Sequence, residues 1–93
     1  MEIKQIEEGQ RGYFIALDNE TEAGRITYTF AGGTKIILDH TEVNDAYRGQ
    51  SIGKKILMGI VNYAREKHIK ILPLCPFAKS VFDRTPEIGD VLF

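Results

Sequence analysis

The stretch AYRGQSIGKKI, residues Ala46 to Ile56, separates two parts of the chain that have different hydrophobic patterns. Before it, apolar and polar residues alternate as they do along half-buried β-strands. After it, apolar residues recur every three or four positions, as they do along one face of an α-helix. Two glycines and three basic side chains lie within the stretch. It is therefore either a plain strand-to-helix turn or a turn whose backbone binds an anion at the start of the helix.

The residues before this turn predict an antiparallel meander. β-Branched and aromatic residues alternate with polar ones, and clusters of turn-forming residues separate the runs. We expect four strands, over residues 2–6, 12–18, 23–31 and 35–43, with Gly32-Gly33 as a two-residue hairpin loop between the last two.

The residues after the turn predict a crossover back to the sheet. The apolar face of an amphipathic helix over residues 51–68 consists of Ile52, Ile56, Leu57, Ile60, Val61 and Ala64. A short strand over 70–74 follows, then a short helix over 76–84 with proline at its first position, and a last strand over 90–93. This order gives a parallel pair of strands with a crossover helix. Gly59, inside the long helix, indicates close packing against a strand.

Length and composition indicate one globular domain over residues 1–93, of the α+β class, with a long and a short helix against a mixed sheet. The apolar fraction is 43% and no apolar run is long enough to cross a bilayer. The start of the chain, MEIKQIEEG, lacks the apolar region of a secretory signal. A single cysteine excludes an internal disulfide and favours a cytoplasmic location. We expect a monomer or a weak homodimer, without a metal and without a membrane partner.

The net charge of −1 hides a division of charge along the chain. Four basic and nine acidic residues lie between Met1 and Asp45, whereas eight basic and two acidic residues lie between Ala46 and Arg84. A basic segment attracts polyanions, but this one lacks the arginine-rich or aromatic-interleaved pattern of nucleic-acid binding. A small anionic ligand fits better than nucleic acid.

The turn has the features of an anion site. Amides at a helix N-terminus lack intrahelical partners, and the helix dipole adds positive potential there. Gly49 and Gly53 would let a phosphate approach the backbone. Arg48 and either Lys54 or Lys55 add positive charge, and Ser51 caps the helix or donates its hydroxyl. As a plain turn, the stretch needs only Gly49 for its geometry and Ser51 as the cap.

The same residues resemble the acetyl-CoA-binding signature of the GNAT superfamily of N-acetyltransferases, R/Q-x-x-G-x-G/A after a strand that ends in valine. Asp45 replaces a frequent proline and Ser51 replaces the middle glycine, which narrows the approach to the pyrophosphate without blocking it. The resemblance implies an acetyl-CoA site formed by Val43, Arg48, Gly49, Gln50, Ser51, Ile52, Gly53 and Lys54.

A second segment is similar to the family pattern N-x-x-A-x-x-L/F-Y. Ala78 matches the alanine and Val81 is an apolar substitute, but Cys75 occupies the asparagine position. Phe82 replaces the tyrosine that in many relatives protonates the leaving coenzyme A thiolate, and phenylalanine cannot donate a proton. The resemblance spans about residues 36–82 and is strongest to small, single-domain members of the superfamily.

Three side chains are candidates for catalysis. His40 and Glu42 are two positions apart on a strand and so share a face, where either can take a proton from an amine; they are equally well ordinary polar residues of a strand. Cys75 would cap a helix that begins at Pro76, where free amides and the dipole lower the pKa of a thiol. The resemblance places Cys75 near the coenzyme sulfur. Packing, proton donation and transient acylation are its three alternative roles.

The sequence thus predicts an enzyme that binds acetyl-CoA as acyl donor and transfers its acetyl group to an amine. The alternative is a non-catalytic acyl-CoA-binding or interaction module, which the short chain and Phe82 favour. The sequence does not name the acceptor amine.

Overall fold

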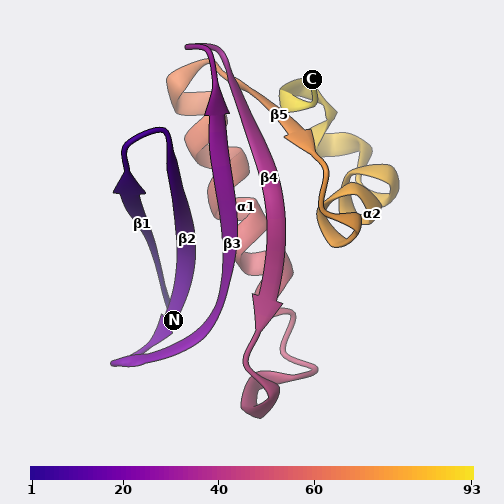
Figure 1. Cartoon of the computed structure of the whole chain (residues 1–93). Helices are drawn as coiled ribbons and strands as arrows, with labels where there is room; N and C mark the ends of the chain where they lie inside the picture. Colours follow the sequence, from indigo (N-terminus) through magenta and orange to yellow (C-terminus); the bar gives the residue numbers. More distant parts are fainter.

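A five-stranded mixed sheet runs through the protein in the order β1-β2-β3-β4-β5 (Figure 1). In the computed structural model, which describes residues 1–93, the strands are β1 (Glu2–Glu8), β2 (Arg11–Asp18), β3 (Thr21–Ala31), β4 (Lys35–Val43) and β5 (Lys70–Pro73). The first four strands pair antiparallel in chain order, and β5 pairs parallel with β4. The predicted α+β fold, a meander followed by a crossover, is confirmed.

Two α-helices and two short 3₁₀-helices complete the fold. They are η1 (Asp45–Tyr47), α1 (Ile52–Lys67), α2 (Pro76–Arg84) and η2 (Pro86–Val91). The crossover helix α1 lies behind the sheet in Figure 1, while α2 and η2 lie beyond the β5 edge. No helix is both long and apolar enough to span a membrane.

Two sequence predictions are wrong. Ala31 pairs with Lys35, so the β3–β4 loop has three residues instead of two, and Gly32 takes a positive φ of 71°. The predicted strand over 90–93 is also absent, because Ile88 and Val91 are buried at the three-residue spacing of a 3₁₀-helix. Only Leu92 joins the sheet, in a single parallel bridge to Ile71.

One face of the sheet and the apolar face of α1 form the core. All six predicted apolar residues of α1 are buried and belong to one cluster of 21 buried residues. The largest fully buried side chains from the strands are Ile26, Tyr28, Ile36, Leu38 and Ile71. The opposite face, called the outer face below, carries the side chains that alternate with these, such as Tyr13, Arg25 and Thr27.

Two glycines allow close approaches between α1 and the sheet. A Cβ on Gly59 would lie 2.9 Å from Cγ2 of Ile3 on β1, which confirms the predicted packing of Gly59 against a strand. A Cβ on Gly24 of β3 would lie 3.0 Å from Cγ2 of Ile52, the first residue of α1. Gly24 therefore lets the start of α1 lie against the sheet.

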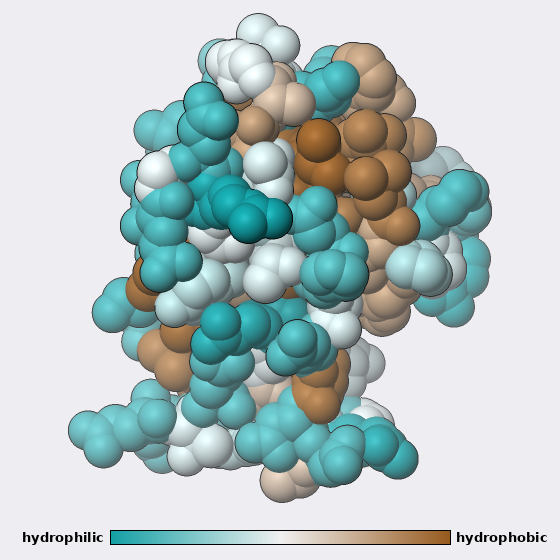
Figure 2. Space-filling model, in the orientation of Figure 1, coloured by the Kyte–Doolittle hydropathy of each residue, from teal (hydrophilic) through white to brown (hydrophobic).

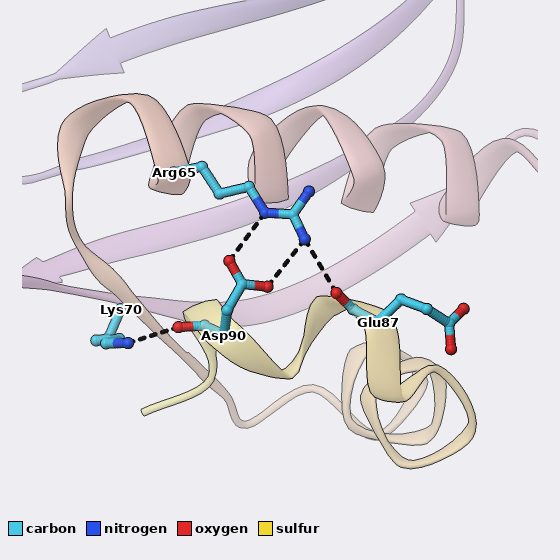
Figure 3. A network of polar contacts seen from close by, with 4 residues as sticks. All are labelled: Arg65, Lys70, Glu87 and Asp90. Atoms are coloured by element: carbon cyan, nitrogen blue, oxygen red, sulfur yellow. Dashed lines mark hydrogen bonds and ion pairs between the residues drawn. The ribbon is translucent and has the colours of Figure 1, made fainter.

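An ionic network fixes η2 to the end of α1 (Figure 3). Arg65 donates from Nε and Nη2 to the two carboxylate oxygens of Asp90, at 3.0 and 2.8 Å, and from Nη2 to the Glu87 carbonyl at 3.0 Å. Lys70 of β5 donates to the Asp90 carbonyl. The Arg65 guanidinium lowers the pKa of the Asp90 carboxyl below its ordinary value. The network holds the C-terminal segment beside β5.

Candidate functional site

The two halves of β4 have different neighbours. Lys35 to Leu38 pair with β3 on one side and with β5 on the other, whereas the residues from His40 to Val43 pair with β3 alone. The amides of Leu74 and Cys75 both donate to the Leu38 carbonyl, each at 3.1 Å, and the chain then turns into α2. In Figure 1, β4 continues past the point where β5 ends. We call the space beyond Leu38 the β4–β5 opening.

A β-bulge lies at the start of this opening. Leu38 pairs with Tyr28 and His40 pairs with Thr27, so Asp39 is an extra residue on β4. Beyond the bulge, Thr41 is on the α1 side, and His40 and Glu42 are on the outer face opposite Thr27 and Arg25. The prediction that His40 and Glu42 share a face agrees with this register.

Cys75 reaches the opening from the α1 side. It is the N-cap residue of α2, as predicted, but its side chain makes no capping hydrogen bond. The residue is 3% exposed, and its Sγ lies 3.0 Å from Oγ1 of Thr41. The two sets of catalytic candidates therefore lie on opposite faces of β4, with Cys75 on one and His40 and Glu42 on the other.

The turn between β4 and α1 is folded by local hydrogen bonds. Asn44 accepts from the Ala46 amide through Oδ1 at 3.0 Å, and its own amide donates to the Ala23 carbonyl at 2.8 Å. Tyr47 Oη donates to the Asp18 carboxylate at 2.8 Å, an interaction that raises the pKa of Tyr47. These bonds tie η1 and the residue before it to β3 and to the end of β2. The turn is thus placed at the end of β4.

The start of α1 has no side-chain cap. Ser51 is the N-cap residue and takes a left-handed conformation, with φ 57° and ψ 37°, but its side chain makes no capping bond. Of its two predicted roles, side-chain capping is therefore wrong, and donation of its hydroxyl to a ligand stays a prediction. The Ser51 carbonyl accepts from the Lys55 amide at 3.0 Å, but the amides of the three residues between them have no backbone acceptor. These three amides belong to Ile52, Gly53 and Lys54. They are free for an acceptor from outside the chain.

The two signature glycines have different surroundings. Gly49 has a φ of 83° and open space where its Cβ would be. Gly53 is buried, and its Cβ would lie 2.8 Å from Cζ of Phe77 on α2. The backbone at Gly49 is therefore open, whereas the absence of a side chain at Gly53 accommodates the Phe77 ring. Arg48 is 80% exposed and pairs with Asp45 at 2.7 Å.

Two cavities flank the first turn of α1. The larger, of about 580 Å³, lies between α1 and β1 and is lined by Ser51, Lys54, Lys55, Met1, Ile3 and Met58. The smaller, of about 300 Å³, lies between α1 and α2 and is lined by Lys54, Val81, Arg84 and Thr85. Basic side chains therefore border the helix start on both sides. No three His, Cys, Asp or Glu side chains gather into a group that can hold a metal ion.

The outer face holds one rigid cationic group beside β4. Arg25 donates from Nε and Nη2 to Glu22, at 2.8 and 2.6 Å, and its guanidinium lies 4.0 Å from the centroid of the Tyr13 ring. The hydrogen bonds to Arg25 lower the pKa of Glu22, and Glu22 raises the pKa of Arg25. Both groups are therefore charged near neutral pH.

Sequence reasoning missed three residues that shape this region. Thr41 contacts the Cys75 thiol, Phe77 covers Gly53, and Gly24 admits Ile52. Only Gly24 carried a signal, because a glycine inside an alternating strand suggests a close approach. The positions of Thr41 and Phe77 depend on pairing and packing that span more than 20 residues.

Comparison with known proteins assigns the chain to a family. A model described as GCN5-related N-acetyl-transferase matches residues 12–91. A GCN5-like protein of Staphylococcus aureus, solved by NMR, is 36% identical with a TM-score of 0.72, over 99% of this chain and 87% of that one. Protein NATD1 of Danio rerio is 26% identical over 77 residues, which are 83% of this chain and 70% of that protein.

An aminoglycoside 6'-N-acetyltransferase complexed with coenzyme A shares the fold, with a TM-score of 0.58 and 20% identity over 67% of this chain and 36% of that one. The chain belongs to the GCN5-related N-acetyltransferase, or GNAT, family.

Proposed function

We propose that this protein binds acetyl-CoA and transfers the acetyl group to an amine. The observation that carries the proposal is the position of three uncapped amides, Ile52 to Lys54, at the end of the strand that separates from β5. An anion at these amides gains hydrogen bonds and the favourable end of the helix dipole. An extended chain attached to that anion can then follow β4 into the opening.

The residues of the turn fit a pyrophosphate. Gly49 leaves the backbone open, and Lys54 supplies a positive charge at the helix start. The proposed acetyl-CoA-binding residues are Val43, Arg48, Gly49, Gln50, Ser51, Ile52, Gly53 and Lys54. A coenzyme A complex of a protein with the same fold supports this choice of ligand.

The proposed chemistry needs a base for the acceptor amine and a donor for the carbonyl oxygen. Acetyl-CoA supplies an activated thioester carbon when it is bound. Backbone amides of β4 near Glu42 to Asn44, beyond the pairing with β5, are the proposed donors to the carbonyl oxygen. His40 and Glu42, exposed on the outer face, are the proposed bases that take a proton from the amine.

Cys75 is the proposed acid or nucleophile on the opposite face. Its thiol can protonate the leaving thiolate, or its sulfur can attack the thioester carbon and carry the acetyl group to the amine. The contact with Thr41 orients the sulfur toward β4, and Phe82, buried in the core, cannot supply the proton. The 3% exposure of Cys75 is equally consistent with a packing role.

A non-catalytic acyl-CoA-binding module is the second candidate function. The observation that favours it is the buried phenylalanine at position 82, where many relatives have the proton-donating tyrosine. Binder and enzyme differ in one measurement, the release of free thiol from acetyl-CoA in the presence of a panel of amines. Steady release that depends on the amine shows transfer, and its absence with intact binding shows a binder.

The binding site is tested by titrating the ¹⁵N-labelled protein with acetyl-CoA. We expect the largest amide shifts at Val43 and from Arg48 to Lys55, and weaker affinity at higher salt, because the contact is partly ionic. Gly49→Val should weaken binding. Gly32→Val is its matched control, since Gly32 also has a positive φ and open space but lies at the other end of β4. Shifts centred on β2 and β3 with a silent turn would contradict the assignment.

The same assays separate the roles of Cys75. Cys75→Ala should retain acetyl-CoA binding and lose most of the thiol release if the sulfur takes part in chemistry. Cys75→Ser should keep more activity if the group donates a proton than if it carries the acetyl group. An acetylated protein detected by mass spectrometry identifies covalent transfer, and full activity of Cys75→Ala identifies packing.

A further inference from the structure

A cavity of about 440 Å³ lies on the outer face of the sheet, beside the β4–β5 opening. Its lining includes Arg11 and Tyr13 on β2, Arg25 on β3, and Asp39 and His40 on β4, with Glu8 on β1. Neighbouring strands are about 4.8 Å apart, so the cavity extends over roughly 10 Å from β4 to β2. Figure 2 shows this face in the orientation of Figure 1, with hydrophilic residues over the middle strands and an apolar area on the β5 side.

Two arginines line the cavity on β2 and β3, and Glu8 of β1, whose Cα pairs with that of Arg11, lines it beside them. Arg25 is held over Tyr13 and uses Nε and Nη2 to bind Glu22, which leaves Nη1 for another acceptor. Arg11 takes part in none of the ion pairs of this chain. The two guanidinium groups therefore present unused donors to the same cavity.

The side next to the opening is acidic. Asp39 is the extra residue of the β4 bulge, and its Oδ2 accepts a hydrogen bond from Oγ1 of Thr29 at 2.8 Å. This bond orients the carboxylate and leaves Oδ1 unused. His40 follows on the same strand and also lines the cavity. A cationic amine bound at Asp39 would lie against the half of β4 that faces the opening.

We propose that this cavity binds the acceptor, and that the acceptor is a small molecule carrying a primary amine and a carboxylate. The amine contacts Asp39 and His40, and the carboxylate contacts Arg11 and Arg25. Arg11 forms no ion pair, Arg25 keeps Nη1 unused, and Asp39 keeps Oδ1 unused, so a ligand with both charges can contact groups that a singly charged ligand leaves without a partner. Its role as acceptor rests on the proposed acetyl transfer, whereas its binding does not.

Three probes of equal length test the proposal: 5-aminovalerate, pentylamine and 1,5-diaminopentane. Each is titrated into the ¹⁵N-labelled protein, free and saturated with coenzyme A, and amide shifts are followed. We expect 5-aminovalerate to shift Tyr13, Arg25 and His40 and to bind about tenfold more tightly than the other two, because only it engages both charged sides. Equal or tighter binding of the diamine would overturn the proposal.

Two matched variants localise the carboxylate contact. Arg11→Ala should weaken 5-aminovalerate about tenfold and leave pentylamine unchanged. Lys4→Ala is the control, because Lys4 pairs with Ile15 on the same face but lies outside the cavity. If both variants bind 5-aminovalerate like the parent protein, the inference is wrong.

The outcome is distinguishable from a failure of the proposed function. If coenzyme A shifts the turn but 5-aminovalerate shifts nothing on the outer face, this inference fails and the acetyl-CoA assignment stands. If coenzyme A does not bind at the turn, the acetyl-CoA assignment fails, and the titration of the free protein still decides whether the cavity binds a dipolar amine.

Discussion

The first half of β4, from Lys35 to Leu38, and the second half, from Asp39 to Val43, belong to one strand but differ in environment. Ile36 and Leu38 are fully buried and lie between two strands, whereas none of the five residues of the second half is buried, and Val43 is 41% exposed. The change occurs at the Leu38 carbonyl, which accepts both the Leu74 and the Cys75 amide. The first half thus lies inside the sheet and the core, and the second half, which has no strand on its β5 side, is where the proposed ligands would contact β4.

Truncations in the two halves should therefore have unequal effects on stability. Leu38→Ala should lower the free energy of unfolding by about 2–5 kcal/mol, because it leaves a cavity in the core. Val43→Ala should change it by no more than about 0.5 kcal/mol, since that side chain is largely exposed. Urea denaturation measures both. If Leu38→Ala does not fold, Ile36→Val should still cost about 0.5–1.5 kcal/mol. Similar losses at Leu38 and Val43 would contradict the division of the strand.

Beside the second half of β4, the start of α1 packs closely against α2 at Gly53. A substitution of Gly53 tests this packing. Gly53→Ala should cost about 1–3 kcal/mol, because the new methyl group meets the Phe77 ring at 2.8 Å. Phe77→Leu in the same chain should recover part of the loss by making room. Thermal unfolding and chemical denaturation provide the measurement.

Gly49→Ala is the comparison for Gly53→Ala. It should cost about 1–2 kcal/mol through backbone strain at positive φ, with no recovery from Phe77→Leu, since nothing lies near its Cβ. If Phe77→Leu rescues both variants equally, the packing explanation for Gly53 is wrong.

Local patterns in the sequence were sufficient for most of the fold. The alternation along residues 35–43 and the apolar spacing along 52–64 each reflect one buried face, and α2 has the predicted bounds, with Pro76 at its first position. The C-terminal segment was mispredicted as a strand, because it buries Ile88 and Val91 in a 3₁₀-helix and contacts Arg65, 25 residues before Asp90. The spacing of His40 and Glu42 correctly predicted that they share a face. The bulge between Leu38 and His40 was not predicted, because it depends on the pairing with β3.

The site was less predictable than the fold. The signature identified the turn and the family, because it is a local motif. The distinct surroundings of Gly49 and Gly53 and the contact between Thr41 and Cys75 depend on α2, which follows 20 or more residues later. The roles of the predicted catalytic and binding residues stay predictions.

Thr41, in the second half of β4, contacts Cys75 at the start of α2, and substitutions of Thr41 test this contact. Thr41→Val should lower stability by about 0.5–1.5 kcal/mol, because Sγ of Cys75 loses its hydroxyl partner at 3.0 Å. Thr41→Ser keeps the hydroxyl and should be closer to the parent protein. In a double-mutant cycle with Cys75→Ala, the loss from Thr41→Val should shrink. A loss that is the same with and without the thiol would show that the hydroxyl acts elsewhere.

The smallest expected effect concerns β5, which pairs with the first half of β4 and contacts the C-terminal segment that contains η2. Because Arg65 keeps the pKa of Asp90 below its ordinary value of 3.8, their pair stabilises the fold fully above about pH 5, and this contribution is lost as pH falls through the folded-state pKa. Asp90→Asn should therefore lower the melting temperature at about pH 7, and the difference from the parent should shrink toward pH 2.

The Asp90 change should also be local. The Phe93 amide, which donates to the Ile71 carbonyl at 2.9 Å, should exchange faster in Asp90→Asn, while amides of the second half of β4 should not change. Asp83→Asn, which removes a single exposed contact with Lys79 at 3.2 Å, is the control and should leave the Phe93 amide unchanged. A melting difference that is constant from neutral to acid pH would show that the carboxylate charge of Asp90 does not support β5. The position of η2 beside β5 would then be stabilised by Ile88 and Val91, two apolar residues of η2 that are buried and do not titrate.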